Sequence, residues 1–298
     1  RLASYSAKQA LLGKEIVIFA TRLNKQLEKL RNQKLTGKLN GAIGNYNALN
    51  LADPNIDWID FSAKFIDSLD LEPNLITNQI NPYDDIAEYF QNYQRINGII
   101  IDMDQDFWRY ISDNWFQQEV KKGEVGSSTM PQKVNPIDFE NSEGNLTIAN
   151  GILETLSRKL AQSRLQRDLS DSTTIRNIGT ALGYSQVGYK SVLSGFLRIK
   201  PNIVKITQDL NSDWVVLTEG VQTLLRREKV DDPYSLISSL SRGEHIDQTK
   251  WESFINSLPI VSKQKEQLRI LTPAAYIGLA VSLTDKAIKD IKDSKKQK

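Results

Sequence analysis

The segment GSSTMPQKVNPIDFE, residues 126–140, joins a polar loop to the start of a long helix. The loop packs glycine, three hydroxyl side chains, one lysine and two prolines into the eleven residues Gly126–Pro136. Asn135 can cap a helix, Pro136 suits a first turn, and the acidic residues that follow suit the positive end of the helix dipole. The segment therefore predicts a helix from Asn135–Pro136, preceded by a loop whose composition folding alone does not require.

Helical patterns continue on both sides of this segment. Apolar residues recur at helical spacing, and Asn81–Pro82 repeats the start signal seen at Asn135–Pro136. A stretch rich in glycine and asparagine predicts a loop over 37–50. The helices expected before residue 200 span 9–32, 57–69, 81–119, 135–160 and 168–197. Beyond Lys200–Pro201 the expected helices are shorter, and the last begins at Thr272–Pro273.

Runs of alternating β-branched residues are nearly absent from the chain. The patterns therefore predict an all-α protein with long central helices. We expect a central helix-bundle domain over residues 1–197, which carries the Gly126–Pro136 loop, and a smaller helical C-terminal domain over 198–298.

Composition limits the classes of partner and site. The chain has 298 residues, 38 basic and 36 acidic side chains, one histidine and no cysteine. The lack of cysteine excludes disulfides and thiolate–metal sites, and a single histidine, His245, leaves no second one for a dyad or a metal site. A net charge of +2 does not favour nucleic acid or a membrane as the main partner. We expect neither, and the opening Arg-Leu-Ala, without an initiating methionine, is typical of a fragment or processed product.

The Gly126–Pro136 loop offers chemistry suited to an anion. Ser127 and Ser128 supply hydroxyls and neighbouring backbone N–H groups, and Lys133 supplies a positive charge six residues after Ser127. An adjacent ammonium and aligned amides favour a serine alkoxide, so Ser127 could abstract a proton. Since Asn135 is expected at a helix N-terminus, the loop would end where anions are stabilised. The alternative is a flexible Ser/Gly linker with a surface lysine.

A second candidate lies in Arg164–Arg176. Ser172 and Arg176 are four residues apart and share a helix face, while Arg167 precedes the expected helix start. Two guanidiniums and a hydroxyl at that place predict a phosphate clamp. The alternative is an exposed helix in which the arginines pair with Asp168 and Asp171.

A weaker candidate is the polar segment 77–83, in which Gln79 could bind a ligand ahead of the helix expected at Asn81. By itself this segment indicates only a helix start.

Taken together, these segments resemble the bacterial-type adenylosuccinate lyases of the fumarase/aspartase superfamily. The Gly126–Pro136 loop is similar to the superfamily signature. The more specific pattern is similar at 37–48, 137–146, 164–176, 213–219 and 271–278. The resemblance runs from about Gly13 almost to the end, so the chain looks like the C-terminal two-thirds of such an enzyme.

The resemblance implies a fold, a reaction and an assembly. The fold would be the long-helix bundle of the superfamily, and the reaction would be β-elimination of fumarate from adenylosuccinate and from the succinylated carboxamide ribotide. The family needs no metal or organic cofactor, acts in the cytoplasm, and forms homotetramers whose active sites each combine three subunits.

The resemblance also implies roles for single residues. Ser127 corresponds to the general base, and Lys133 and Asn135 to residues that contact the succinyl moiety, with Ser128 beside them. Arg167, Ser172 and Arg176 match residues that hold the nucleotide and its phosphate, and Gln79 matches a substrate-binding glutamine.

The chain departs from the family pattern where a general-acid histidine is expected. An ungapped continuation upstream of Gly13–Glu15 places Ala3 at that position, and Gln132 stands where the signature often has histidine. An alternative is therefore a catalytically inactive, truncated homologue that serves as a scaffold or partner subunit. Argininosuccinate lyase is a further alternative that would suit Met130–Lys133, but the Arg167–Ser172–Arg176 clamp argues against it.

Overall fold

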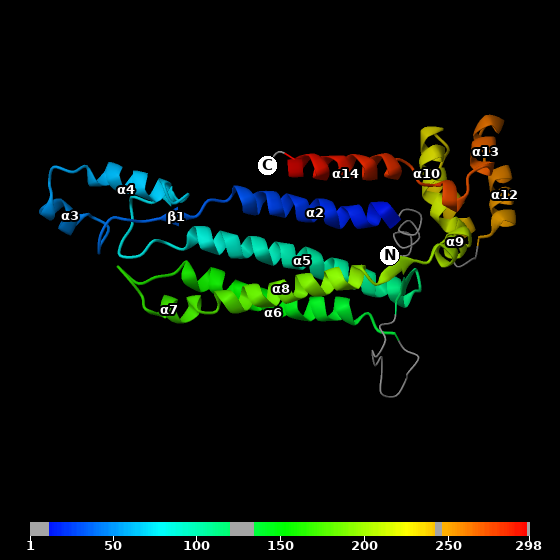
Figure 1. Cartoon of the computed structure of the whole chain (residues 1–298). Coiled ribbons are helices and arrows are strands. Elements are labelled where there is room, and N and C mark those ends of the chain that lie inside the picture. The colour runs from blue at the N-terminus through cyan, green and yellow to red at the C-terminus, as the bar shows by residue number, and fades with distance from the viewer. Residues whose placement is uncertain (1–11, 120–133, 242–245, 297–298) are drawn as a thin grey trace. The chain divides into compact units, whose positions relative to one another are not determined.

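The computed structural model describes residues 12–119, 134–241 and 246–296 (Figure 1). Contacts divide the chain into two compact units. The bundle unit consists of the described parts of Arg22–Ile111 and Gln118–Ile199. The terminal unit consists of the described parts of Arg1–Thr21, Ser112–Gln117 and Lys200–Lys298. The expected domains, 1–197 and 198–298, stay a prediction, because contacts within one chain do not establish independent folding.

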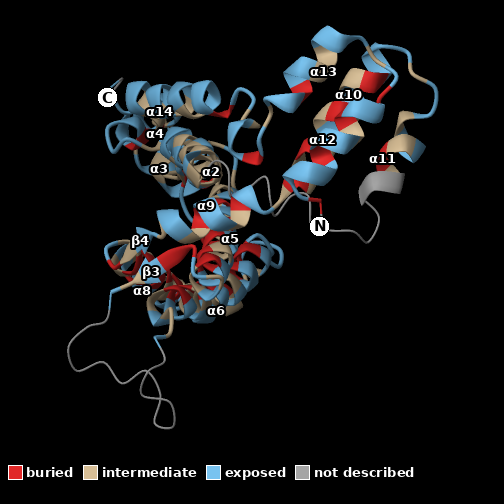
Figure 2. Ribbon diagram, turned by 90° about the vertical axis from the view of Figure 1, so that its right-hand side faces the viewer, coloured by how far each residue is buried: buried red, intermediate tan, exposed pale blue. Residues whose placement is uncertain are grey.

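Three long helices form the centre of the bundle unit, and they lie side by side in Figures 1 and 2. They are α5 (Asp84–Ser112), α6 (Ile137–Leu160) and α8 (Ile178–Phe196). Two glycines let α8 approach α6 closely, since a Cβ at Gly188 would lie 2.6 Å from the Leu146 side chain. A Cβ at Gly195 would lie 2.9 Å from the Phe139 ring.

Aromatic packing closes one end of this three-helix core. Phe107 of α5 stacks on Phe139 of α6 with ring centroids 5.6 Å apart, and Phe196 of α8 meets Phe107 edge-on at 4.7 Å. All three helices therefore contact one another where α6 begins and α8 ends. Figure 2 shows buried residues gathered in this part of the unit.

A second apolar cluster fills the opposite end, where α6 ends and α5 and α8 begin. Its buried members are Phe90, Leu153, Leu156, Leu160 and Ala181. Tyr83 and Ile175 pack against it, so the segment before α5 and the short helix α7 (Ser170–Ile175) are held at this end of the bundle.

The other elements of the bundle unit are short, apart from the C-terminal part of α2 (Leu12–Asn32). Asp57 caps helix α4 (Trp58–Asp67), because its carboxylate accepts hydrogen bonds from the amides of Ile59 and Asp60. Helix α3 spans Asn47–Ala52. Strands β1 (Thr36–Gly37) and β2 (Glu72–Pro73) pair in parallel, with Thr36 opposite Glu72. This pairing joins the two ends of the segment 38–71, which contains α3 and α4.

A core in the terminal unit is formed by residues between Trp214 and Tyr276, among which Leu217, Leu225, Trp251 and Ile255 are fully buried. The indole nitrogen of Trp251 donates a hydrogen bond to the Leu268 carbonyl at 3.2 Å. The helices are α9 (Ile203–Asn211), α10 (Thr218–Arg227), α11 (Pro233–Ser241), α12 (Gln248–Ser257), α13 (Ser262–Arg269) and α14 (Ala280–Lys296), with 3₁₀ turns at Trp214–Leu217 and Pro273–Ala275. Short strands lie at β3 (Phe116–Gln118) and β4 (Ile199–Pro201).

The predicted all-α class is confirmed, but three expected helix starts are wrong. The side chain of Asn81 binds Asn74 and Thr36 instead of capping, and α5 begins at Asp84. Asn135 is not the cap residue of α6, since Pro136 occupies that position and offers no side-chain hydrogen bond. Thr272 caps only a three-residue 3₁₀ turn, and α14 begins at Ala280.

The sequence predicted one continuous helix over 168–197, which is also wrong. The structure has two helices there, α7 and α8, separated at Arg176–Asn177. No glycine or proline marks this division in the sequence. Within the parts of the chain that the structure describes, no helix combines the length and apolarity needed to cross a membrane.

One buried carboxyl group makes the stability of the bundle unit depend on pH. Asp104 of α5 is 1% exposed, and no hydrogen bond of ordinary geometry to a described residue reaches either carboxylate oxygen. Burial raises the pKa of Asp104 to about 7, and Glu143 adds to the rise while the nearby Ser142 hydroxyl opposes it. In the unfolded chain the same group titrates near its ordinary value of 3.8.

The expected result is that Asp104 lowers the stability of the native chain as pH rises from about 4 to about 7. The folded state keeps the proton that the unfolded state has lost, so the free energy of unfolding falls over that window. Asp104→Asn should therefore raise the free energy of unfolding above pH 7 by on the order of 3 kcal/mol and leave it nearly unchanged near pH 3. Urea unfolding across this pH range checks it, with exposed Asp67→Asn as the control. An equal effect at both extremes would contradict the assignment.

Candidate functional site

One end of the bundle unit brings two of the predicted site segments together. The Asn78 side-chain amide donates to the Leu165 carbonyl at 2.9 Å, which joins the segment before α5 to the segment before α7. The pKa of Tyr83 is raised first by burial and then by the Asp171 carboxylate, while the Arg167 guanidinium lowers it. Gln79 and the Arg164–Arg176 segment, which lie far apart in sequence, therefore share one region of the surface.

The turn before α7 is built around Asp168. Its carboxylate accepts the Ser170 amide at 2.8 Å, and this bond is the main reason why the pKa of Asp168 is lowered. Lys159 and the Arg164 guanidinium each lie 3.6 Å from the same carboxylate. The expected alternative, arginine–aspartate pairing, is thus realised by Arg164.

Arg167 and Arg176 are exposed, and neither guanidinium forms an ion pair with another residue of the described chain. Asp171 is buried, and its carboxylate accepts the Ser172 amide at 2.6 Å. Two guanidiniums without ion-pair partners, one on each side of the short helix α7, are available to bind an oxyanion such as a phosphate.

Ser172 and Arg176 keep the spacing that the sequence predicts. Ser172 lies in α7, and Arg176, directly after its last residue, has helical dihedral angles of φ −60° and ψ −19°. The two residues are therefore one turn apart. The Ser172 hydroxyl donates to the Leu169 carbonyl at 2.8 Å, so its oxygen lone pairs remain to accept a hydrogen bond from a ligand.

Gln79 is exposed, and its backbone carbonyl accepts a hydrogen bond from the Lys38 ammonium at 2.8 Å. The sequence reasoning missed Lys38. The surrounding glycine- and asparagine-rich stretch indicated only a loop, and nothing in it pointed to a contact with a segment forty residues away.

Of the signature-loop residues, Ser127, Ser128 and Lys133 lie outside the described residues, as does His245. Asn135 is described, and its backbone carbonyl accepts the Gln118 side-chain amide at 2.9 Å. This bond connects the two described stretches of chain that lie on either side of segment 120–133.

Arg198 makes further hydrogen bonds to residues on both sides of segment 120–133, namely Glu119 and Asp138. Its Nη1 donates to the Asp138 carboxylate at 2.6 Å, and its Nε and Nη2 donate to the Glu119 carbonyl at 3.3 and 3.0 Å. In return the Glu119 amide donates to the Arg198 carbonyl at 2.7 Å. Arg198 is 7% exposed, and no local signal in the sequence distinguished it.

The described site residues form two groups at opposite ends of α6. Asn135 precedes its first residue, whereas Arg167, Ser172, Arg176 and Gln79 lie where it ends. Helix α6 has 24 residues, which at 1.5 Å per residue is about 36 Å. One copy of the chain therefore does not bring Asn135 to the Arg167–Arg176 group.

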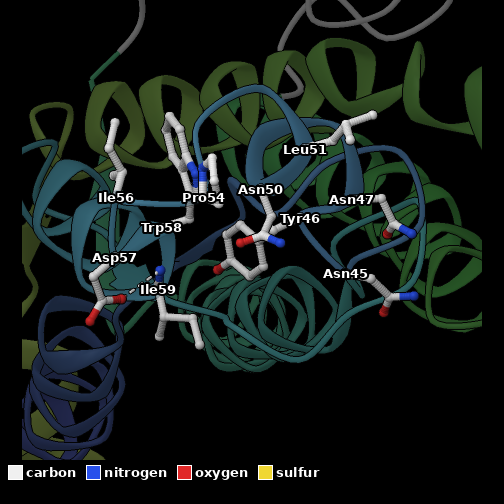
Figure 3. A pocket seen from close by; sticks show the side chains of 10 residues that line it. All are labelled: Asn45, Tyr46, Asn47, Asn50, Leu51, Pro54, Ile56, Asp57, Trp58 and Ile59. Carbon is white, nitrogen blue, oxygen red and sulfur yellow. Dashed lines mark hydrogen bonds between the residues drawn. The ribbon is translucent and has the colours of Figure 1, made fainter.

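The chain also has a surface hollow of about 850 Å³ that contains none of the predicted site residues (Figure 3). It lies between α3 and α4, and several of its polar groups are already engaged within the chain. Asp57 caps α4, the Trp58 indole donates to the Asp53 carbonyl at 2.9 Å, and the Tyr46 hydroxyl lies 2.8 Å from that of Ser62. Among the described residues, no three His, Asp or Glu side chains are grouped as metal ligands would be.

Two family models match the chain. The model described as "Lyase" matches residues 6–151, and the model "Adenylosuccinate lyase C-terminal" matches residues 163–277. Between them they cover the signature loop, the Gln79 segment and the Arg167–Arg176 group.

Curated relatives extend the similarity over nearly the whole chain. An adenylosuccinate lyase of Haemophilus influenzae is 47% identical over 280 residues, and one of Escherichia coli K12 is 44% identical over 279 residues. Each match covers 94% of this chain but 61% of the relative, so the chain spans less than two-thirds of their length.

A solved structure shows the fold. The 3-carboxy-cis,cis-muconate lactonizing enzyme of Pseudomonas putida superposes with a TM-score of 0.66, covering 98% of this chain and 70% of that enzyme, at 18% identity. The long-helix bundle expected from the sequence is thereby confirmed. Together with the matches above, nearly the whole chain is therefore similar in sequence to curated adenylosuccinate lyases, and residues 163–277 match the C-terminal part of that family.

Proposed function

We propose that this chain provides the greater part of an adenylosuccinate lyase, which eliminates fumarate from adenylosuccinate to leave AMP and acts likewise on the succinylated carboxamide ribotide. The observation that carries the proposal is the Arg167–Arg176 group. It carries two guanidiniums without ion-pair partners in the described chain and one hydroxyl, on a segment that the Asn78–Leu165 hydrogen bond joins to the Gln79 segment, so a nucleotide phosphate and its succinylated base could be held there. The named activity of the curated relatives supports the same reaction.

In the proposed mechanism Ser127 removes a proton from the succinyl carbon beside a carboxylate. The electron pair left on that carbon forms the C=C bond of fumarate as the C–N bond to the purine breaks. The C–N electron pair leaves with the purine nitrogen, which takes up a proton from a group other than Ser127 to become the amino group of AMP. The intermediate carries its charge on the carboxylate, so donors that face this group lower the barrier. We assign that role to Lys133 and Asn135, with Ser128 beside them.

We also propose that the complete site needs other copies of the chain. Asn135 and the Arg167–Arg176 group lie about 36 Å apart along α6, so one succinylated nucleotide can meet both only if subunits combine. Exposed apolar residues on α6 and α8, namely Ile137, Ile148, Val187 and Leu193, supply a surface for such contacts. A homotetramer with shared sites in the cytoplasm is the arrangement we propose.

A second candidate is a catalytically inactive partner subunit, which the alanine at the family's histidine position favours. An enzyme assay separates the two. We would measure fumarate release by the chain alone and after mixing with E. coli adenylosuccinate lyase inactivated at its own base serine. Turnover by the chain alone supports the enzyme, whereas turnover only in the mixture supports a partner subunit that contributes its Ser127 to a complete subunit's site. No turnover in both would support an inactive partner.

The same assay, given argininosuccinate, tests the remaining alternative. Adenylosuccinate should be the preferred substrate, because an arginine-based substrate offers no phosphate to the Arg167–Arg176 group. Faster fumarate release from argininosuccinate would overturn the assignment.

Arg176→Ala is expected to weaken AMP binding by about 10- to 100-fold, since a charge-assisted hydrogen bond contributes about 1.5–3 kcal/mol. Titration calorimetry with AMP and with adenosine checks this, and the affinity for adenosine should stay within a factor of two. Arg164→Ala is the matched control, because Arg164 faces Asp168 and not the proposed phosphate. Equal losses for AMP and adenosine would show that Arg176 does not bind the phosphate.

A further inference from the structure

One ammonium group makes three hydrogen bonds where the segment that carries Gln79 meets the Gly37–Asn50 loop. The Lys38 Nζ donates to the carbonyl oxygens of Gly41, Asn78 and Gln79 at 2.9, 3.0 and 2.8 Å. An ammonium has three N–H donors, so all three are engaged with backbone. Two of the three acceptors are Gln79 and the residue before it.

Other residues of the Gly37–Asn50 loop also pack closely against the segment that carries Gln79. Asn40 is fully buried, and its side-chain amide donates to the Leu75 carbonyl at 3.3 Å and to the Thr77 hydroxyl at 2.8 Å. Gly44 has φ +80°, and a Cβ there would lie 1.9 Å from the Thr77 carbonyl oxygen. Only glycine therefore fits, and the two segments touch backbone to backbone.

The segment that carries Gln79 in turn contacts the Arg164–Arg176 segment. The Asn78 side-chain amide donates a hydrogen bond to the carbonyl of Leu165, which lies two residues before Arg167. The Asn78 carbonyl accepts a hydrogen bond from the Lys38 ammonium. Asn78 thus connects Lys38 to both proposed substrate-binding segments.

We infer that Lys38 is a positioning residue, which holds Gln79 in place for the succinylated nucleotide without binding that nucleotide itself. The inference rests on the proposed function for what Gln79 binds, and on the hydrogen bonds alone for what Lys38 holds. With its three donors engaged, the ammonium has none left for a substrate carboxylate or phosphate. Its flexible stem and compact charge suit three carbonyls that converge on one point.

The test compares Lys38→Met, which keeps the stem and removes the donors, with Lys64→Met as the matched control. Lys64 pairs with Asp60 on the exposed surface of α4 and touches nothing near Gln79. The first readout is hydrogen–deuterium exchange of residues 74–80, where the Asn74 and Ile80 amides donate to the Gly37 carbonyl and the Asn78 side chain. We expect at least fivefold faster exchange in Lys38→Met and no change in Lys64→Met.

The second readout is the kinetics of the assembly that releases fumarate. Lys38→Met should raise KM for adenylosuccinate about tenfold while kcat changes less than threefold, and Lys38→Arg should recover most of the loss. A merely structural role would lower the amount of active enzyme and leave KM unchanged. Should Lys38→Met fail to fold, Lys38→Gln, which keeps two donors, is expected to show the same changes at smaller size.

The outcomes separate the two proposals. Unchanged exchange over 74–80 overturns the positioning role whatever the activity. Faster exchange with unchanged KM overturns the link between Lys38 and substrate. If the unsubstituted chain releases no fumarate in any assembly, the proposed function fails, while the exchange readout still decides what Lys38 holds.

Discussion

Ser127→Ala is expected to lower fumarate release from adenylosuccinate by roughly 10²–10⁴-fold, the usual range for removing a general acid–base group. Alanine keeps the backbone amide but has no oxygen to take the succinyl proton. Binding should persist, because the proposed nucleotide contacts come from Gln79 and the Arg167–Arg176 group. The measurement is steady-state turnover together with the dissociation constant of adenylosuccinate, in the assembly that releases fumarate.

The matched control for Ser127→Ala is Ser212→Ala. Ser212 is exposed in the terminal unit, where its hydroxyl donates to the Asp209 carbonyl at 2.8 Å, and its loss should leave turnover within a factor of two. If Ser127→Ala kept full turnover, Ser127 would not be the base. If Ser127→Ala abolished substrate binding as well as turnover, Ser127 would have a structural role and not a catalytic one.

Arg198→Met is expected to destabilise the bundle unit by about 3–5 kcal/mol, the cost of breaking a buried ion pair on one side only. The Arg198 side chain is 8% exposed and lies 2.6 Å from a carboxylate of Asp138 that is 17% exposed. Methionine keeps much of the apolar stem. It leaves the Asp138 charge and the Glu119 carbonyl without the donors that now satisfy them. The midpoint and slope of urea unfolding measure the loss.

A surface pair provides the control for Arg198. Arg158 lies 2.7 Å from Glu154 on α6, but these side chains are 77% and 54% exposed. Arg158→Met should therefore cost no more than about 0.5 kcal/mol. The double variant Arg198→Met/Asp138→Asn should recover part of the loss, since no uncompensated carboxylate remains. A loss for Arg198→Met as small as that for Arg158→Met would contradict the proposed role of the pair.

The helices were largely predictable because their signals are local. Apolar residues at helical spacing predicted α2, α4 and α6 to within a few residues at their described ends, and Asp57 caps α4 where a helix was expected to begin. The wrong helix starts have a physical reason. Asn81 satisfies its amide on Thr36, 45 residues away, and a local pattern cannot report such a partner.

The sequence proposed the residues of the candidate site, and their roles stay predictions, but it did not indicate how they are arranged. The spacing of Arg167, Ser172 and Arg176 indicated a phosphate clamp, and the Asn78–Leu165 hydrogen bond brings Gln79 to it across 87 residues. Lys38 and Arg198 were missed because their roles depend on carbonyl oxygens 41 and 79 residues distant. The separation of Asn135 from the clamp, by contrast, follows from the length of α6, a helix that the sequence predicted between them.

Photolabelling with 8-azido-AMP tests most directly whether the clamp end of the bundle unit binds the nucleotide. Mass spectrometry of the labelled chain should find adducts within 74–83 and 163–177, and excess AMP should prevent them. Saturable labelling confined to the hollow lined by 45–59, or labelling that AMP does not prevent, would contradict the account.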